Sequence, residues 1–161
     1  MPWNKPYHPP RNQRLDPELY RQVGRITFIT IRAYLHAAPF VNESINQMIV
    51  DTLREEQERQ HCAVYTYCLM PDHLHYLVGP VQEGVSVLVF SDQFKGKTTN
   101  RSWQHGWRGK LWQPRSYDHI VRVEEDLRQI AEYILNNPVR KGLVDHAEDW
   151  PWSGHLTPLL L

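Results

Sequence analysis

The 161-residue sequence lacks the features that mark membrane, secreted and disulfide-rich proteins. It has no uninterrupted apolar run long enough to span a bilayer and no signal-peptide pattern. Its only cysteines, Cys62 and Cys68, are separated by too much extended chain to bridge each other, and neither belongs to a C-x-x-C zinc pattern. These absences predict a cytoplasmic protein with reduced thiols and no membrane partner.

The sequence also lacks an excess of charge, since 18 basic residues balance 18 acidic residues. A neutral sum argues against a strongly basic nucleic-acid-binding protein, but the two signs are segregated along the chain. Basic residues gather in segments 11–32 and 95–122, and acidic residues gather in segments 51–58, 124–126 and 145–149. This segregation fits either a positive face on a neutral molecule or an ordinary solvated surface.

Proline is concentrated in the opening segment, MPWNKPYHPP, which has no hydrophobic periodicity. We therefore expect a flexible arm over residues 1–20 and a single folded domain over residues 21–161. No repeat and no other low-complexity segment divides the rest of the chain.

The hydrophobic pattern predicts an α+β fold. Strands are expected at 25–32, 62–69, 73–79 and 116–123, with the second and third joined as a hairpin by a short turn at 70–72. Helices are expected at 42–60, with Ser44 and Gln47 as a capping box, at 85–101, and at 124–137, with acidic residues in the first turn and Pro138 as the stop. This order matches a ferredoxin-like, split βαβ antiparallel sheet with helices on one face, plus an additional C-terminal helix.

The third strand contains two histidines, His73 and His75, with one leucine between them. Residues two apart in a strand share a face, so both imidazoles point the same way. Such a pair can bind a metal, relay a proton or serve only as hydrogen-bonded structure. Metal binding requires a third ligand from another element.

The last helix can supply one if it packs across the sheet face that the histidines occupy. Tyr133 and Asn137 are four residues apart and border the apolar stripe of this helix. A divalent metal held by two imidazoles and an amide oxygen can polarise a phosphate as a Lewis acid, which would allow a tyrosine to attack it. Core-edge packing for the tyrosine and helix capping for the asparagine are the alternatives.

Four separated motifs, MPDHLHYLV, GKLWQPRSYDHIVR, EEDLRQIAEYILNNPVRKGLV and EDWPWSG, together resemble the REP-associated tyrosine transposases, which are related to the single-tyrosine insertion-sequence transposases of the HUH nuclease superfamily. The resemblance runs from about Arg25 to Gly154. It implies a metal-dependent single-stranded DNA endonuclease and strand transferase that cuts and rejoins hairpin-forming repeats. It also implies His73, His75 and Asn137 as ligands of Mg²⁺ or Mn²⁺, and Tyr133 as the nucleophile that forms a 5′-phosphotyrosine.

The basic, tryptophan-rich segment before the fourth strand suits contacts with single-stranded DNA, because aromatic rings stack on bases and cations bind phosphates. The candidate DNA contacts are Lys95, Lys97, Arg101, Trp103, Trp107, Arg108, Lys110, Arg115 and His119. A structural hydrogen bond is the alternative for His119. For Trp112, anchoring of the loop to the core is at least as good an interpretation. We interpret the DWPWS motif as packing of the C-terminal segment.

Two other functions are consistent with the pattern. A domesticated relative could hold hairpin DNA or RNA without cutting it, and a phosphodiesterase could use the two histidines in hydrolysis, although no carboxylate near them is an obvious base. The resemblance implies two arrangements: domain-swapped dimers with the tyrosine helix supplied in trans, as in the insertion-sequence relatives, or monomers, as repeat-associated relatives can be. We expect a monomer, with a homodimer as the alternative.

Overall fold

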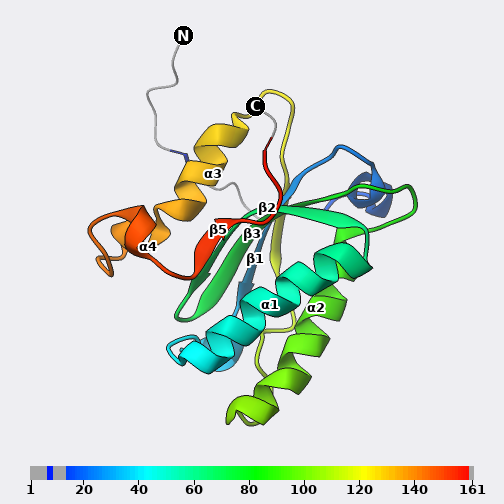
Figure 1. The fold of residues 1–161 in the computed structure, drawn as a ribbon. Coiled ribbons are helices and arrows are strands. Elements are labelled where there is room, and N and C mark those ends of the chain that lie inside the picture. The colour runs from blue at the N-terminus through cyan, green and yellow to red at the C-terminus, as the bar shows by residue number, and fades with distance from the viewer. Residues whose placement is uncertain (1–6, 9–13, 160–161) are drawn as a thin grey trace.

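A five-stranded antiparallel sheet in the order β4-β1-β3-β2-β5 forms the centre of the protein (Figure 1). The computed structural model describes residues 7–8 and 14–159. Its strands are β1 (Thr27–Arg32), β2 (Cys62–Met70), β3 (His73–Pro80), β4 (Tyr117–Ile120) and β5 (Ser153–His155), and its α-helices are α1 (Glu43–Arg59), α2 (Val87–Ser102), α3 (Leu127–Leu135) and α4 (Asn137–Arg140). The predicted α+β class and the order of elements up to α3 are confirmed.

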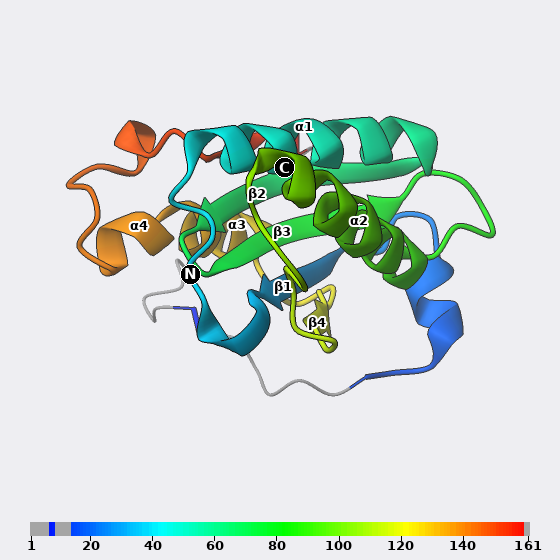
Figure 2. The same ribbon diagram turned by 90° about the horizontal axis from the view of Figure 1, so that it is seen from below.

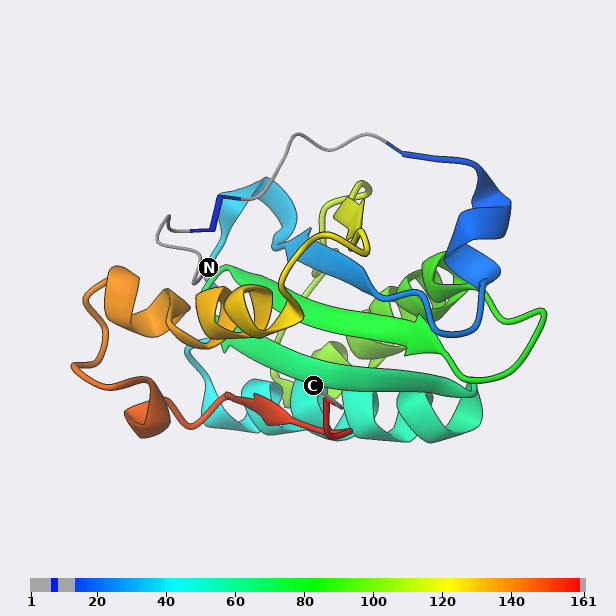
Figure 3. The ribbon, with the colours of Figure 1, turned by 90° about the horizontal axis from the view of Figure 1, so that it is seen from above.

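The helices lie on both faces of this sheet. Helices α1 and α2 cover one face, and α3 and α4 lie against the other, as the two opposite views show (Figures 2 and 3). Phe90 of α2 and Ile49 of α1 belong to the larger core cluster, together with Leu74 of β3. Ile130 and Ile134 of α3 belong to a second cluster on the other face. The additional helix therefore packs on the face opposite the first two helices.

The β2–β3 hairpin determines which face each side chain of β3 occupies. Met70 pairs with His73 and Cys68 pairs with His75, and β1 pairs with the other edge of β3, with Thr30 opposite His75. Leu74 packs in the cluster under α1 and α2, so the two histidines face α3, as their spacing predicts.

Two helix boundaries differ from the predicted ones. Asn42, not Ser44, caps α1, because its side chain accepts hydrogen bonds from the backbone N–H groups of Ser44 (2.8 Å) and Ile45 (3.2 Å). The predicted capping box is therefore wrong. Similarly, Asp126 caps α3 through the Arg128 N–H, so the acidic residues precede the helix and its first turn contains none.

The predicted stop at Pro138 is also different in the structure. Helix α3 ends at Leu135, and Pro138 lies in the first turn of a second short helix, α4. Proline is well suited to a first helical turn, where its missing N–H has no partner to lose. Asn137 thus begins α4, and Pro138 restarts the helical path after the break.

Part of the predicted N-terminal arm is packed against the domain. Tyr20, in a 3₁₀ helix over Pro17–Arg21, is 1% exposed, and its hydroxyl donates a hydrogen bond of 2.7 Å to Asp118. The ring of Tyr7 lies 5.3 Å from that of Tyr133 and 6.4 Å from that of Phe28. Residues 1–6 and 9–13 of the predicted arm lie outside the described residues.

The C-terminal segment closes the sheet at the β2 edge. Strand β5, which the sequence pattern did not predict, pairs with β2, and the Trp150 indole donates a hydrogen bond of 3.0 Å to the Leu69 carbonyl. This packing fits the interpretation of the DWPWS motif. Cys62 and Cys68 are free and buried, and burial raises the pKa of each thiol to about 12. None of the helices in 7–8 and 14–159 has the length and hydropathy of a membrane span.

A buried carboxylate links α1 to α2. Glu56 is 0% exposed and accepts hydrogen bonds from Arg59 and Gln60 of the same helical end, and it forms an ion pair with Lys97 of α2. Burial raises the pKa of this carboxyl, but the hydrogen bonds from Arg59, Lys97 and Gln60 together lower it to about 2.

We predict that Glu56→Gln lowers the free energy of unfolding by about 2 kcal/mol at pH 7, because charged hydrogen bonds are lost. The folded pKa lies below the ordinary value near 4.5, so this stabilisation is present above that pH and is lost as the pH falls toward 2. Thermal or urea unfolding at pH 7 and pH 3 measures the difference. Exposed Glu58→Gln is the control, and an equal loss at both pH values would contradict the prediction.

Candidate functional site

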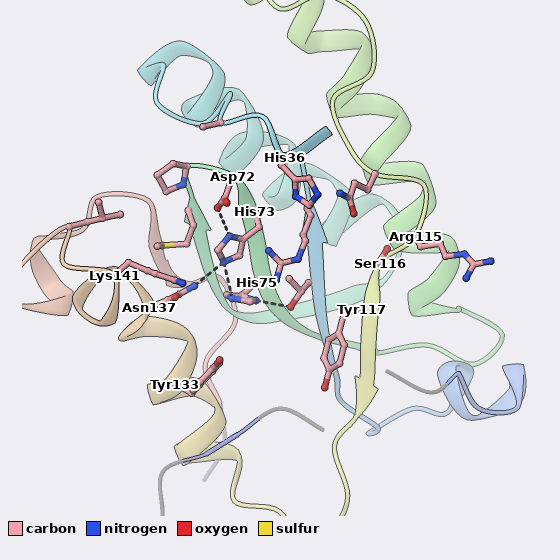
Figure 4. A pocket seen from close by; sticks show the side chains of 17 residues that line it. His36, Asp72, His73, His75, Arg115, Ser116, Tyr117, Tyr133, Asn137 and Lys141 are labelled. Carbon is pink, nitrogen blue, oxygen red and sulfur yellow. Dashed lines mark hydrogen bonds and ion pairs between the residues drawn. The ribbon is translucent and has the colours of Figure 1, made fainter. Parts of the chain in front are cut away.

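A pocket with a volume of about 770 Å³ lies on the α3 face of the sheet. Figure 4 shows that its walls come from β1, β3, the segment leading into β4, and helices α3 and α4. The predicted residues His73, His75, Tyr133 and Asn137 all line it. Four residues separated by up to 64 positions in the chain therefore share one pocket.

The two histidines meet through their Nε2 atoms. His73 and His75 are 6% and 8% exposed, and their Nε2 atoms are 3.1 Å apart. Each Nδ1 has a separate partner: Asp72 Oδ1 lies 2.6 Å from Nδ1 of His73, and Thr30 Oγ1 lies 2.7 Å from Nδ1 of His75 (Figure 4). A carboxylate accepts the Nδ1 proton of His73, which leaves a lone pair on its Nε2.

The surroundings keep both imidazoles neutral. Burial lowers the pKa of His73, although the hydrogen bond to Asp72 opposes this effect. Burial lowers the pKa of His75 well below its ordinary value, and the repulsion that a protonated His75 would meet from a protonated His73 and from Arg140 acts in the same direction. Neutral imidazole is the form that binds metal ions.

The third predicted ligand reaches the same point from α4. The Asn137 amide nitrogen lies 3.0 Å from His73 Nε2, and the residue is 3% exposed. Rotation of the amide group by half a turn would exchange its nitrogen and oxygen, so that the oxygen faces the histidine pair. No group of three or more His, Cys, Asp or Glu side chains suited to a metal occurs within the described ranges. The Asn137 amide is a side chain that meets this pair from another element.

The donor spacing fits a transition-metal-sized ion. Metal–nitrogen bonds of about 2.0–2.1 Å at angles between about 90° and 109° place two donor nitrogens about 2.8–3.4 Å apart. The observed separation of the histidine Nε2 atoms, 3.1 Å, falls within this interval. The outer hydrogen bonds from Asp72 and Thr30 are the kind that orient histidine ligands. A donor set of two imidazoles and an amide therefore fits a divalent transition-metal cation.

Tyr133 stands beside this cluster. Its ring centroid is 6.5 Å from that of His75, and Figure 4 shows its hydroxyl projecting from α3 toward the histidine pair. The Arg140 guanidinium carbon lies 3.8 Å from the centre of the same ring. The arrangement places a phenol oxygen on one side of a pocket and three potential metal-binding side chains on another.

Cationic side chains border the pocket. Arg32, Arg115 and Lys141 line it, together with His36. None of the three lysine and arginine side chains forms an ion pair with a carboxylate among the residues that the structure describes. A phosphate entering the pocket therefore meets these three cations, while Asp72, a carboxylate in the same lining, is hydrogen-bonded to His73.

The candidate DNA contacts in α2 lie away from this pocket. Lys97 pairs with Glu56 of α1, and Arg101 pairs with Glu55 at 2.7 Å. Lys95 donates hydrogen bonds to the carbonyls of Gln113 (2.7 Å) and Pro114 (3.1 Å). These three cations hold α2 to α1 and to the segment before β4.

The tryptophan-rich loop forms its own smaller pocket. Trp103, Trp107 and Arg108 line it. Each indole N–H is fixed to a loop carbonyl, Trp103 to Gly109 at 2.8 Å and Trp107 to Lys110 at 3.1 Å. Trp103 remains 52% exposed. The same loop continues through Gln113 and Arg115 to the border of the larger pocket, so the two pockets share one segment.

Two other residues have structural partners. Trp112 is 5% exposed and donates to Thr98 Oγ1 at 2.8 Å, which supports its interpretation as a core anchor. His119 Nε2 lies 2.8 Å from the Glu125 carboxylate. This contact fits a structural hydrogen bond, the alternative to a DNA contact for this residue. Lys110 lies 5.2 Å above the ring of Tyr34.

Sequence reasoning missed two residues of the site. Asp72 lies in the hairpin turn, yet its side chain reaches back to His73. Thr30 lies opposite His75 on β1. The sequence signal for Asp72 is its position directly before the first histidine, whereas Thr30 becomes visible only when strand pairing and register are known.

The chain matches a protein-family model described as "Transposase IS200 like" over residues 22–137. A Haemophilus influenzae protein named as a REP-associated tyrosine transposase is 26% identical over an alignment of 145 residues, which covers 81% of this chain and 79% of that protein. The REP-associated tyrosine transposase of Escherichia coli is 27% identical over an alignment of 110 residues, which covers 66% of this chain and 62% of that protein.

Solved structures share the fold. The structure of a REP-associated tyrosine transposase bound to a REP hairpin matches with a TM-score of 0.70 at 24% identity, over 83% of this chain and 78% of that chain. A Deinococcus radiodurans protein described as a transposase matches with a TM-score of 0.51 at 24% identity, over 71% of this chain and 92% of that chain.

Proposed function

Because the chain belongs to the IS200-like transposase family, we propose that it is a metal-dependent endonuclease and strand transferase acting on single-stranded, hairpin-forming repeat DNA. One observation carries the proposal: His73 Nε2 lies about 3 Å from both His75 Nε2 and the Asn137 amide, in the pocket that Tyr133 also lines. The relative of matching fold was solved with a REP hairpin, which supports hairpin DNA as the substrate class.

The proposed reaction is a transesterification. The Tyr133 phenol oxygen attacks the scissile phosphorus and releases its proton to solvent. The bond from phosphorus to the 3′ oxygen breaks, and that oxygen takes a proton from solvent and leaves as a 3′ hydroxyl. The product is a 5′-phosphotyrosine. It is also a phosphodiester, so attack by a 3′ hydroxyl can rejoin a strand without a nucleotide cofactor.

Each pocket residue has a defined part in this proposal. His73, His75 and Asn137 would hold a divalent ion, which supplies Lewis-acid polarisation of the phosphate when bound. Asp72 and Thr30 orient the imidazoles through their Nδ1 atoms. Arg32, Arg115 and Lys141 bind the flanking phosphates, and the Trp103–Trp107 pocket stacks an unpaired base.

The first test is covalent capture. We predict that the wild-type protein, labelled hairpin DNA with a single-stranded flank, and Mn²⁺ give a protein–DNA adduct on a denaturing gel, and that Tyr133→Phe abolishes the adduct while retaining hairpin binding. Tyr65→Phe, a half-buried tyrosine of β2 outside the pocket, is the matched control. An adduct that survives Tyr133→Phe rules out this nucleophile. Tight hairpin binding by wild type without any adduct supports the non-cleaving alternative.

The second test concerns the metal. We predict that His73→Ala and His75→Ala each weaken Mn²⁺ binding at least about tenfold in calorimetric titration, because each removes an imidazole ligand. Chelation should stop adduct formation by the wild-type protein and added Mn²⁺ should restore it. Exposed His146→Ala is the control. Unchanged Mn²⁺ affinity in both pocket variants would exclude the histidine pair as the metal site.

The third test separates the cations at the pocket from those between the helices. We predict that Arg115→Ala weakens hairpin binding and reduces the slope of log affinity against log salt concentration by about 0.7, the value for one lost single-strand phosphate contact. Lys97→Ala should leave this slope unchanged and lower thermal stability, because Lys97 pairs with Glu56. The reverse pattern would place the DNA on the α1–α2 face.

A further inference from the structure

One short helix carries both a candidate metal ligand and a cation that contacts the candidate nucleophile. Asn137 and Arg140 are the first and last residues of α4, three positions apart and therefore neighbours on the helix surface. Asn137 lies against His73 at 3.0 Å. The Arg140 guanidinium carbon lies 3.8 Å from the centre of the Tyr133 ring. This helix connects the metal side of the pocket to the phenol.

The charge of Arg140 is not neutralised by a neighbouring carboxylate. Among the described residues it forms no ion pair, whereas Arg59 and Arg101, at the α1–α2 contact, each pair with a glutamate. A guanidinium over an aromatic face is held by attraction to the ring electrons. Its N–H groups lie in the guanidinium plane and point outward from its edge, so they can still donate to a phosphate.

This contact strengthens when the phenol reacts. A neutral phenol offers the cation only its ring electrons, but the attacking oxygen gains negative charge as its proton leaves. Attraction to a fixed cation therefore grows between the ground state and the transition state, which is the condition for an interaction to accelerate a reaction.

We propose that Arg140 is a positioning residue for Tyr133: the guanidinium stacks on the phenol ring, holds its hydroxyl toward the histidine pair, and lies beside the phosphate once the 5′-phosphotyrosine has formed. The arginine donates no proton, and the bonds made and broken are those of the transesterification. This inference rests on the proposed function, which it deepens by adding a residue outside the metal-binding set.

Single-turnover adduct formation at saturating hairpin tests the proposal, with hairpin affinity measured in parallel. Arg140→Met retains an unbranched apolar side chain without the charge, and we expect its adduct rate to fall about tenfold or more while hairpin affinity changes less than threefold. Arg140→Lys retains the charge but not the planar group that stacks on the ring. Its adduct rate should lie between those of the wild-type protein and Arg140→Met. Guanidinium ions at millimolar concentration should partly restore the rate of adduct formation in Arg140→Ala. Arg128→Met, an exposed arginine of α3, is the control.

Three results overturn the proposal: a wild-type adduct rate in Arg140→Met, equal losses of rate and of hairpin affinity, or no rescue by guanidinium. A wild-type protein without an adduct refutes the proposed function separately. In that case NMR still decides the stacking, since ring current from Tyr133 should shift the Arg140 side-chain protons upfield, and this shift should vanish in Tyr133→Leu. An unshifted Arg140 signal in the wild-type protein refutes the positioning role.

Discussion

The alternation of side chains along β3 is the constraint on which the candidate site depends. His73 and His75 face α3, while Leu74 and Tyr76 belong to the core beneath α1 and α2. Hydrogen-bonded neighbours on both edges, β1 and β2, fix the register of the strand. A slip by one residue would bury both imidazoles under the first two helices and turn the apolar side chains into the pocket. The strand register that packs the core is therefore the same register that places the histidines in the pocket.

The two faces of the sheet also explain how a neutral protein can present a cationic pocket. On the α1–α2 side, cations are matched by glutamates: Lys97 with Glu56, and Arg101 with Glu55. On the α3 side, Arg115 and the other cations at the pocket have no carboxylate partner in the described chain. Net charge sums the two faces and hides this difference, whereas a DNA backbone would meet only one of them.

Local patterns in the sequence were enough to predict much of this fold. Alternating and 3.6-residue hydrophobic periods identified four strands and three helices, and their order restricted the topology to a split βαβ sheet. Strand alternation predicted that His73 and His75 share a face, and helical spacing predicted that Tyr133 and Asn137 are neighbours. That the two pairs meet in one site was implied by the family resemblance. The chemical roles of these four residues remain predictions.

The features that were missed depend on contacts with no local signal. The three-residue strand β5 is defined by pairing with β2, and the packing of Tyr7 and Tyr20 joins the N-terminal region to distant elements. Asp72 reaches His73 only because the hairpin turn directs its side chain back toward the strand. Asn42 displaced the predicted capping box because either of two nearby polar side chains can cap the same helix end.

The break between α3 and α4 has a consequence for the site that a continuous helix would not provide. Asn136 ends α3 with a backbone conformation of φ −85° and ψ 0°, and Pro138 then opens α4. In an unbroken α-helix, Tyr133 and Arg140 would lie two turns apart along one face, about 10.5 Å along the axis. The change of direction instead allows the guanidinium of Arg140 to return to the Tyr133 ring while Asn137 reaches His73. A proline that appeared to end a helix thus lies at the junction that brings the Tyr133 phenol and the Asn137 amide to one pocket, with the Arg140 cation against the tyrosine ring.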